Sequence, residues 1–113
     1  NNTIYDNSTH ATQFTANILL SSESNNQAFN NRIKGGNAGI QISQTCSGCL
    51  AYNNSIYGAV ELGLYVEAGG TIRNNIIQDS GDKNIHLLIP GSVTRSNNLC
   101  FGGASGASEY CTA

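Results

Sequence analysis

A few polar and aromatic residues of this chain carry groups that suit a sugar. They are Gln41, Tyr65, Glu67 and His86. A tyrosine ring offers a flat apolar face with a polar tip, and amide, carboxylate and imidazole groups supply donors and acceptors for hydroxyl groups. These residues form the candidate carbohydrate site.

The same residues could support the reaction of a polysaccharide lyase. There, a base removes the proton next to a uronate carboxylate, while a cation neutralises the developing charge. His86 and Tyr65 are the candidate base and acid. Lys83 and Arg95, which we expect in flanking loops, are the candidate partners of the substrate carboxylate.

Two other interpretations of these residues stay open. A glycosidase needs two carboxyl groups that face each other at roughly 5 to 9.5 Å, and Glu67 with Asp82 is the only pair that suggests itself. A histidine between Ile85 and Leu87 is also what the solvated face of an ordinary strand contains.

A repeat must position these side chains. Five Asn-Asn pairs begin at positions 1, 30, 53, 74 and 97, with periods of 29, 23, 21 and 23 residues. This period is typical of one coil of a β-solenoid and is too short for two-helix repeats. Two residues after each pair comes a residue of the kind that points inward: Ile4, Ile33, Ile56, Ile77 and Cys100.

The alternation of residue types predicts three short strands per coil. In one coil they cover residues 63–67, 71–73 and 76–78, and the first strand recurs at 17–21, 39–43 and 84–88. Two inward ladders follow from this alignment, and we predict that they form the core: Ile18, Ile40, Leu64 and Ile85, then Leu20, Ile42, Val66 and Leu87.

The paired asparagines have a structural interpretation. A sharp corner needs residues that tolerate left-handed backbone angles, and stacked Asn side chains can bond to one another from coil to coil. Asn25-Asn26 is out of phase and is expected in a loop, and residues 6–13 are expected to be an insertion in a corner loop.

The recurring Asn-Asn-x-Ile followed by Gly-Ile-x-Ile, as in residues 30–42 and, with Val66 last, 53–66, resembles the right-handed parallel β-helix repeat superfamily, which includes pectate-lyase-like and other polysaccharide-lyase-like solenoids. The resemblance covers nearly the whole chain. It implies an all-β fold: one domain, residues 1–113, forming a right-handed single-stranded parallel β-helix of about five coils with three short sheets and Asn-rich corners. Activity does not follow, because this scaffold hosts several chemistries.

In the polysaccharide-processing members that the chain resembles, the substrate groove runs along the first sheet. The resemblance therefore implies a polysaccharide partner and, for an enzyme, a polysaccharide lyase or related activity. It places the candidate site in two outward columns of that sheet: Leu19, Gln41, Tyr65 and His86, then Ser21, Ser43, Glu67 and Leu88. Calcium-dependent members use several acids and a strand-borne Lys or Arg, and no such acidic cluster is evident here, so we predict no cofactor and find calcium unsupported.

Four cysteines predict two disulfides. Cys46 and Cys49 share one loop, whereas Cys100 lies on an inward ladder several coils later. Coils stack at about 4.8 Å, so the two groups should be roughly 10 to 14 Å apart, beyond the ~7 Å that a disulfide spans between Cα atoms. We expect Cys46–Cys49 and Cys100–Cys111, the second tying a capping tail, residues 101–113, over the end of the stack. Zinc or redox chemistry at Cys46-x-x-Cys49 lacks further ligands and context.

Composition and charge exclude some partners. Only 11% of residues are charged and the net charge is −2, so we predict neither nucleic-acid nor membrane binding. The cysteines favour a secreted, extracellular protein. The chain opens in the middle of a coil, which suggests the C-terminal part of a longer secreted chain.

A non-catalytic role is the alternative. A stack of about five coils is short for a substrate groove, which leaves a structural, adhesin or tailspike-like solenoid as the second hypothesis. Unpaired sheet edges at an open end would also permit end-to-end self-association.

Overall fold

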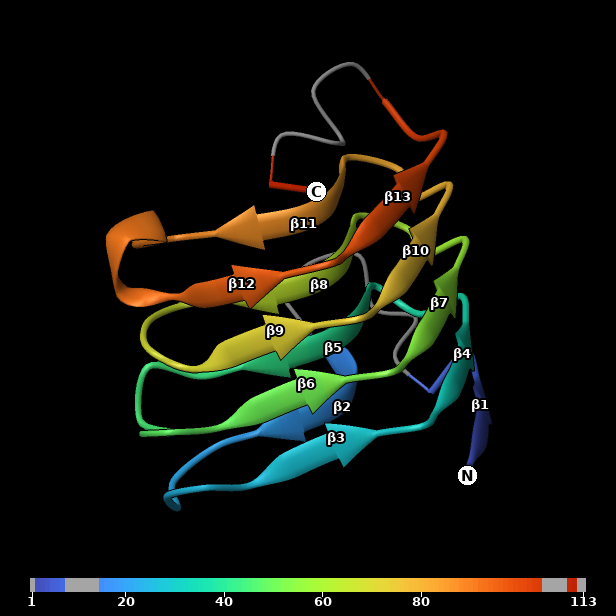
Figure 1. The fold of residues 1–113 in the computed structure, drawn as a ribbon. Helices are drawn as coiled ribbons and strands as arrows, with labels where there is room; N and C mark the ends of the chain where they lie inside the picture. Colours follow the sequence, from blue (N-terminus) through green and yellow to red (C-terminus); the bar gives the residue numbers. More distant parts are fainter. Residues whose placement is uncertain (1, 8–14, 105–109, 112–113) are drawn as a thin grey trace.

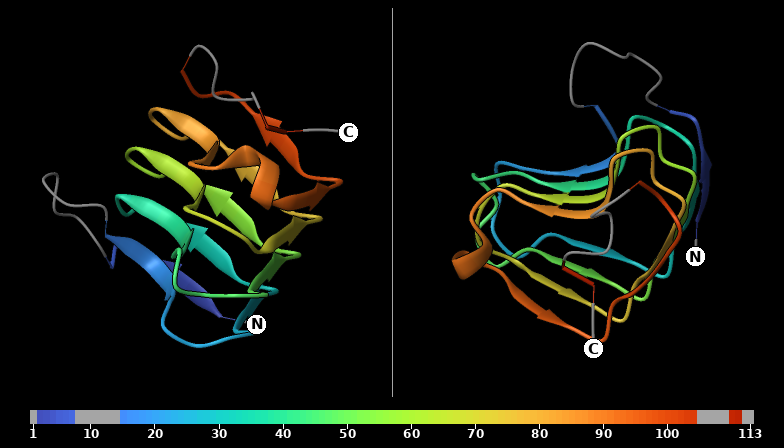
Figure 2. Two further views of the ribbon diagram at one scale, coloured as in Figure 1. Left: turned by 90° about the vertical axis from the view of Figure 1, so that its left-hand side faces the viewer. Right: turned by 90° about the horizontal axis from the view of Figure 1, so that it is seen from above.

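The computed structural model describes residues 2–7, 15–104 and 110–111, which wind into a stack of similar coils (Figure 1). Each coil contributes one strand to each of three parallel sheets, and a view along the stack shows the sheets enclosing a common interior (Figure 2). The expected three-sheet solenoid is confirmed, with about four turns in place of about five coils, since two of the sheets have four strands.

The three sheets are named here by the order of their strands. Sheet A contains β1 (Thr3–Tyr5), β4 (Arg32–Lys34), β7 (Ser55–Tyr57), β10 (Ile76–Gln78) and β13 (Leu99–Phe101). Sheet B contains β2 (Ala16–Leu20), β5 (Ala38–Ile42), β8 (Leu62–Val66) and β11 (Lys83–Leu87). Sheet C contains β3 (Gln27–Phe29), β6 (Leu50–Tyr52), β9 (Thr71–Arg73) and β12 (Thr94–Ser96), and a single 3₁₀ turn, η1 (Pro90–Ser92), precedes β12.

The core consists of the inward ladders. Ile18, Ile40, Leu64 and Ile85 are register partners, as are Leu20, Ile42, Val66 and Leu87. All eight belong to the core or pack against it; Ile18, on the first rung of sheet B, is only half-buried. Sheet A adds the residues that follow the Asn pairs, since Ile33, Ile56 and Ile77 are at most 2% exposed. The sequence-based core is therefore confirmed.

The corner between sheets C and A is built by the asparagine pairs. The first member of each complete pair has a positive φ, from 53° at Asn97 to 56° at Asn30 and Asn53. The second member is buried and donates its side-chain amide to the next rung: Asn31 to Asn54 (3.0 Å), Asn54 to Asn75 (3.0 Å) and Asn75 to Asn98 (2.9 Å). The ladder hypothesis is confirmed, and Asn25 lies in the β2–β3 turn, as expected for a loop residue.

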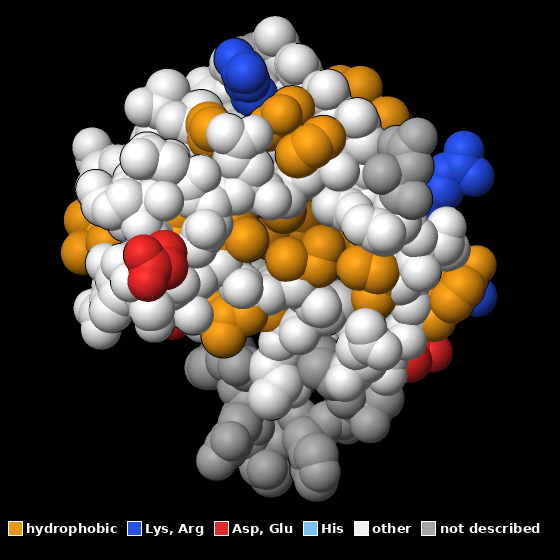
Figure 3. Space-filling view, turned by 90° about the horizontal axis from the view of Figure 1, so that it is seen from below, with side chains coloured by type: hydrophobic (Ala, Val, Ile, Leu, Met, Phe, Trp, Pro, Cys, Tyr) orange, Lys and Arg blue, Asp and Glu red, His pale blue; other side chains and the backbone are white. Residues whose placement is uncertain are grey.

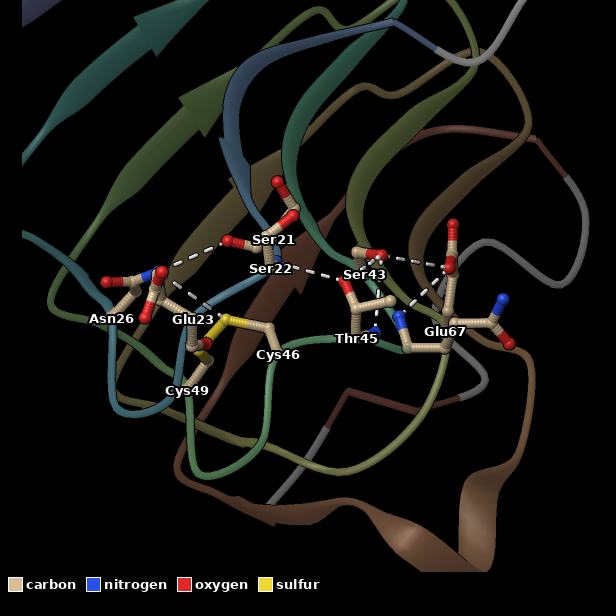
Figure 4. The surroundings of a disulfide bond; sticks show 10 residues. Ser21, Ser22, Glu23, Asn26, Ser43, Thr45, Cys46, Cys49 and Glu67 are labelled. Atoms are coloured by element: carbon tan, nitrogen blue, oxygen red, sulfur yellow. Dashed lines mark hydrogen bonds between the residues drawn. A yellow bond between two sulfur atoms is a disulfide. The ribbon is translucent and has the colours of Figure 1, made fainter.

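Two disulfides have the predicted pairing. Cys46–Cys49 and Cys100–Cys111 each span 5.7 Å between Cα atoms. The first lies in the β5–β6 turn with both cysteines buried, beside Glu23 and Asn26 of the turn below (Figure 4). The second joins β13 to the tail, where Tyr110 and Cys111 pack against the core. Most of the expected insertion, and tail residues 105–109 and 112–113, lie outside the described residues.

Candidate functional site

The outer face of sheet B brings the predicted sugar-binding residues together. Gln41, Tyr65 and His86 are register partners on β5, β8 and β11, because each alternates with inward residues of its strand. Glu67 directly follows β8. Lys83 begins β11 and pairs with Leu62, whose column packs against Tyr65.

Glu67 is held from the coil below (Figure 4). One carboxylate oxygen accepts a hydrogen bond of 2.6 Å from the Gln41 amide, and the other accepts from the Gln44 backbone N–H at 3.0 Å and from the Ser43 hydroxyl at 3.5 Å. Gln41 itself is only 7% exposed. The carboxylate is thus fixed by the protein, and its acceptor sites are largely occupied.

Tyr65 and His86 form an aromatic pair on adjacent rungs. Their ring centroids are 5.4 Å apart with an interplanar angle of 33°. Tyr65 is 9% exposed, and this burial, with a smaller contribution from Glu67, raises the pKa of its phenol above the ordinary value of 10.0. Tyr65 therefore keeps its proton near neutral pH and can act as a donor rather than as a base.

His86 is partly exposed at the upper end of this column. Its Nδ1 is buried and has no hydrogen-bond partner among the described residues. A histidine that acts as a base is commonly oriented by a third group, such as a carboxylate on the other ring nitrogen. In the described part of the chain, His86 has no such orienting group.

Arg95 does not belong to this face. It lies in β12 of sheet C, at the register position of Ile72, and its guanidinium carbon is 5.2 Å from the centroid of the Tyr110 ring. The expectation of a loop beside the candidate site is wrong for Arg95, which covers the end of the core instead. The expectation of a loop position is also wrong for Lys83, although this residue does lie at the edge of the candidate face.

The structure argues against the glycosidase pair. Asp82 precedes β11, whereas Glu67 follows β8, so the two lie at opposite ends of neighbouring parallel strands. Six residues of extended chain separate these positions by about 20 Å along the strand direction, well beyond the roughly 9.5 Å limit for an inverting pair.

Two further features of the described residues bear on cofactors and membranes. No three His, Cys, Asp or Glu side chains within 2–7, 15–104 and 110–111 come together as a metal site. In the same ranges, no helix has the length and apolar character needed to cross a membrane.

Sequence analysis missed a hollow on the outer face of sheet A. It has a volume of about 340 Å³, and the side chains that frame it include Tyr5, Arg32, Lys34 and Tyr57. These residues lie at fixed offsets from the Asn pairs, on either side of the inward residue, so the repeat did contain the signal. It was overlooked because attention was on the first strand of each coil.

Comparison with known families identifies the scaffold. The family model described as the right handed beta helix region matches residues 1–100. The chain belongs to the right-handed β-helix family. This result agrees with the parallel sheets, the inward ladders and the Asn corners of this β-helix. Searches of curated proteins and of solved structures returned no match.

Proposed function

We propose that this β-helix is an extracellular carbohydrate-binding module that binds polysaccharide on the outer face of sheet B. The observation that supports the proposal is the single column formed by Gln41, Tyr65 and His86, with Glu67 and Lys83 near its two edges. Amide, phenol, imidazole and ammonium groups in one column match the hydroxyl and carboxylate groups of a sugar chain. Two disulfides fit an oxidising, extracellular environment.

The same face has the groups for an elimination reaction on a uronate polysaccharide. In this extension of the proposal, His86 takes the proton next to the carboxylate, and the electron pair of that C–H bond forms a double bond. The glycosidic C–O bond then breaks, and its oxygen receives the Tyr65 proton, which water later restores. The raised pKa of Tyr65 supports its role as the acid, and Lys83 neutralises the carboxylate.

A screen of the purified chain against neutral and uronate polysaccharides tests both levels. His86→Ala should weaken binding at least several-fold while leaving the unfolding midpoint unchanged, because His86 is partly exposed and accepts no structural bond there. Leu88→Ala, in the same region and 57% exposed, is the matched control. New ultraviolet absorbance from unsaturated sugars would establish a lyase, whereas binding without such products would leave recognition alone.

A structural solenoid is the second candidate function. It is favoured by the burial of Gln41 and Tyr65, which are 7% and 9% exposed and leave a ligand little of either side chain to contact. If no polysaccharide binds and His86→Ala has no effect, the sheet B proposal is wrong and the structural role stands.

A further inference from the structure

The outer face of sheet A carries an alternating column of aromatic and polar side chains. Tyr5, Lys34, Tyr57, Gln78 and Phe101 are successive register partners from β1 to β13. The aromatic residues occupy every second rung and are 62%, 48% and 52% exposed at Tyr5, Tyr57 and Phe101. Because neighbouring rungs are about 4.8 Å apart, the rings recur about every 10 Å along the stack.

Sheet C shows why this alternation matters. There, Phe29 and Tyr52 lie on adjacent rungs and stack on each other at 5.2 Å between centroids and 7° between planes. Arg73, on the next rung, lies 5.3 Å from the Tyr52 ring. These side chains cover one another. On sheet A, by contrast, Lys34 and Gln78 separate the aromatic residues, and among the described residues no ring contact covers them.

The charge on this face is locally positive. Arg32 and Lys34 are two of the five basic residues in a chain whose net charge is −2. Both line the hollow of about 340 Å³, and no Asp or Glu is among the residues that frame it. Neither cation forms an ion pair within the described part of the chain, so both are available to a ligand anion.

A polar hollow continues the surface toward the Asn corner. It has a volume of about 290 Å³, shares Thr3 and Arg32 with the first, and adds Asn2 and Asn30. The two hollows together offer ring faces, cations, amides and hydroxyl groups along one side of the molecule.

We propose that this surface, the sheet A groove, is a second binding site, and that it takes a linear anionic polysaccharide lying along the stack. The apolar faces of its sugar rings rest on Tyr5 and Tyr57, and its carboxylates approach Arg32 and Lys34. A polymer with a regular repeat fits a surface that itself repeats from rung to rung. Nucleic acid fits less well, because its affinity depends on several phosphate contacts and the groove has two cations.

NMR mapping distinguishes this site from the face of sheet B. Titration of the labelled chain with oligogalacturonate should shift amides of residues 32–34 and 55–57. Shifts confined to residues 38–42, 62–67 and 83–87 would support the sheet B proposal and overturn this one. Shifts in both groups would support both, and no shifts with any oligogalacturonate would overturn the sheet A site.

Matched variants then test the chemistry. Tyr57→Ala should weaken oligogalacturonate binding about tenfold, whereas Tyr57→Phe, which keeps the ring, should remain within about twofold. Lys34→Gln should weaken binding and reduce its dependence on salt. Tyr52→Ala, on the self-stacked face of sheet C, should have no effect. Equal binding by wild type, Tyr57→Ala and Lys34→Gln, or tighter binding of single-stranded DNA or of a neutral glucan, would refute the proposal.

Discussion

At the scale of single residues, the buried asparagines are the part of the structure most sensitive to substitution. Asn75 is fully buried. It accepts bonds from the Asn54 backbone and side chain at 3.1 and 3.0 Å, and it donates to Ala51 and Asn98 at 2.9 Å each. Its removal would leave several buried polar groups without partners, and each such group costs about 1 to 3 kcal/mol.

Asn75→Ala should therefore lower the free energy of unfolding by about 2 to 4 kcal/mol in urea denaturation. Asn74→Gly is the matched control, because Asn74 has a φ of 54° and glycine adopts that angle without strain. A loss of similar size in both variants would mean that the backbone turn, rather than the hydrogen-bonded ladder, stabilises this corner.

Tyr65 gives the site a pH dependence that can be measured. Burial raises the pKa of its phenol above 10.0 in the folded chain, so the folded state retains this proton to higher pH than the unfolded state does. The resulting stabilisation is fully present below pH ~10 and is lost as the pH rises through the folded-state pKa. Tyr65→Phe should show a shallower alkaline decline in stability than wild type, whereas Tyr57→Phe, at an exposed position, should follow wild type. Parallel curves for wild type and Tyr65→Phe would contradict this account.

At the scale of strands and corners, close packing requires glycine at the start of the sheet B strands. A Cβ added at Gly63 would overlap Ile77 Cγ2 and lie only 2.6 Å from the Asn84 carbonyl oxygen. Gly63→Ala should thus cost about 1 to 3 kcal/mol of stability by overpacking. Gly91→Ala, where an added Cβ meets nothing within 4 Å, should change the denaturation midpoint little. Tolerance of Gly63→Ala would show that neighbouring coils can separate without loss.

The same scale shows what the sequence could reveal. The strands of sheet B begin and end one residue earlier than the alternation predicted, since pairing with the neighbouring rung decides the boundaries. The position of Arg95 could have been predicted, because it precedes its Asn pair by the same offset as Ile72. The burial of Tyr65 and the binding of Glu67 by Gln41 could not, because both depend on how outward side chains settle against one another.

At the scale of the whole molecule, the two disulfides differ in what they constrain. Cys46–Cys49 closes a separation of 3 residues within one turn, whereas Cys100–Cys111 closes a separation of 11 and ties the tail to the top rung. On the chain-entropy model, the longer loop stabilises the fold by roughly 2 to 3 kcal/mol and the shorter by about 1 kcal/mol less. Cys100→Ala with Cys111→Ala should therefore lower the melting temperature measurably and expose the top of the core to protease. An unchanged melting temperature in this double variant would show that the tail is not a cap.

The two ends of the stack are not equivalent, and this asymmetry makes end-to-end association testable. The upper end carries Tyr110 and Cys111, whereas in the described residues β2 and β3 pair on one side only. Seen from below, hydrophobic side chains gather in the middle of that lower end (Figure 3). Because unpaired strands beside apolar surface favour association, we expect dimers through the lower ends in sedimentation experiments as the concentration rises. Ile18→Lys, on the inward half-buried ladder, should abolish them, whereas Leu19→Lys, the outward neighbour that is 54% exposed, should not. A monomer at every concentration, or equal effects of the two variants, would contradict association through this end.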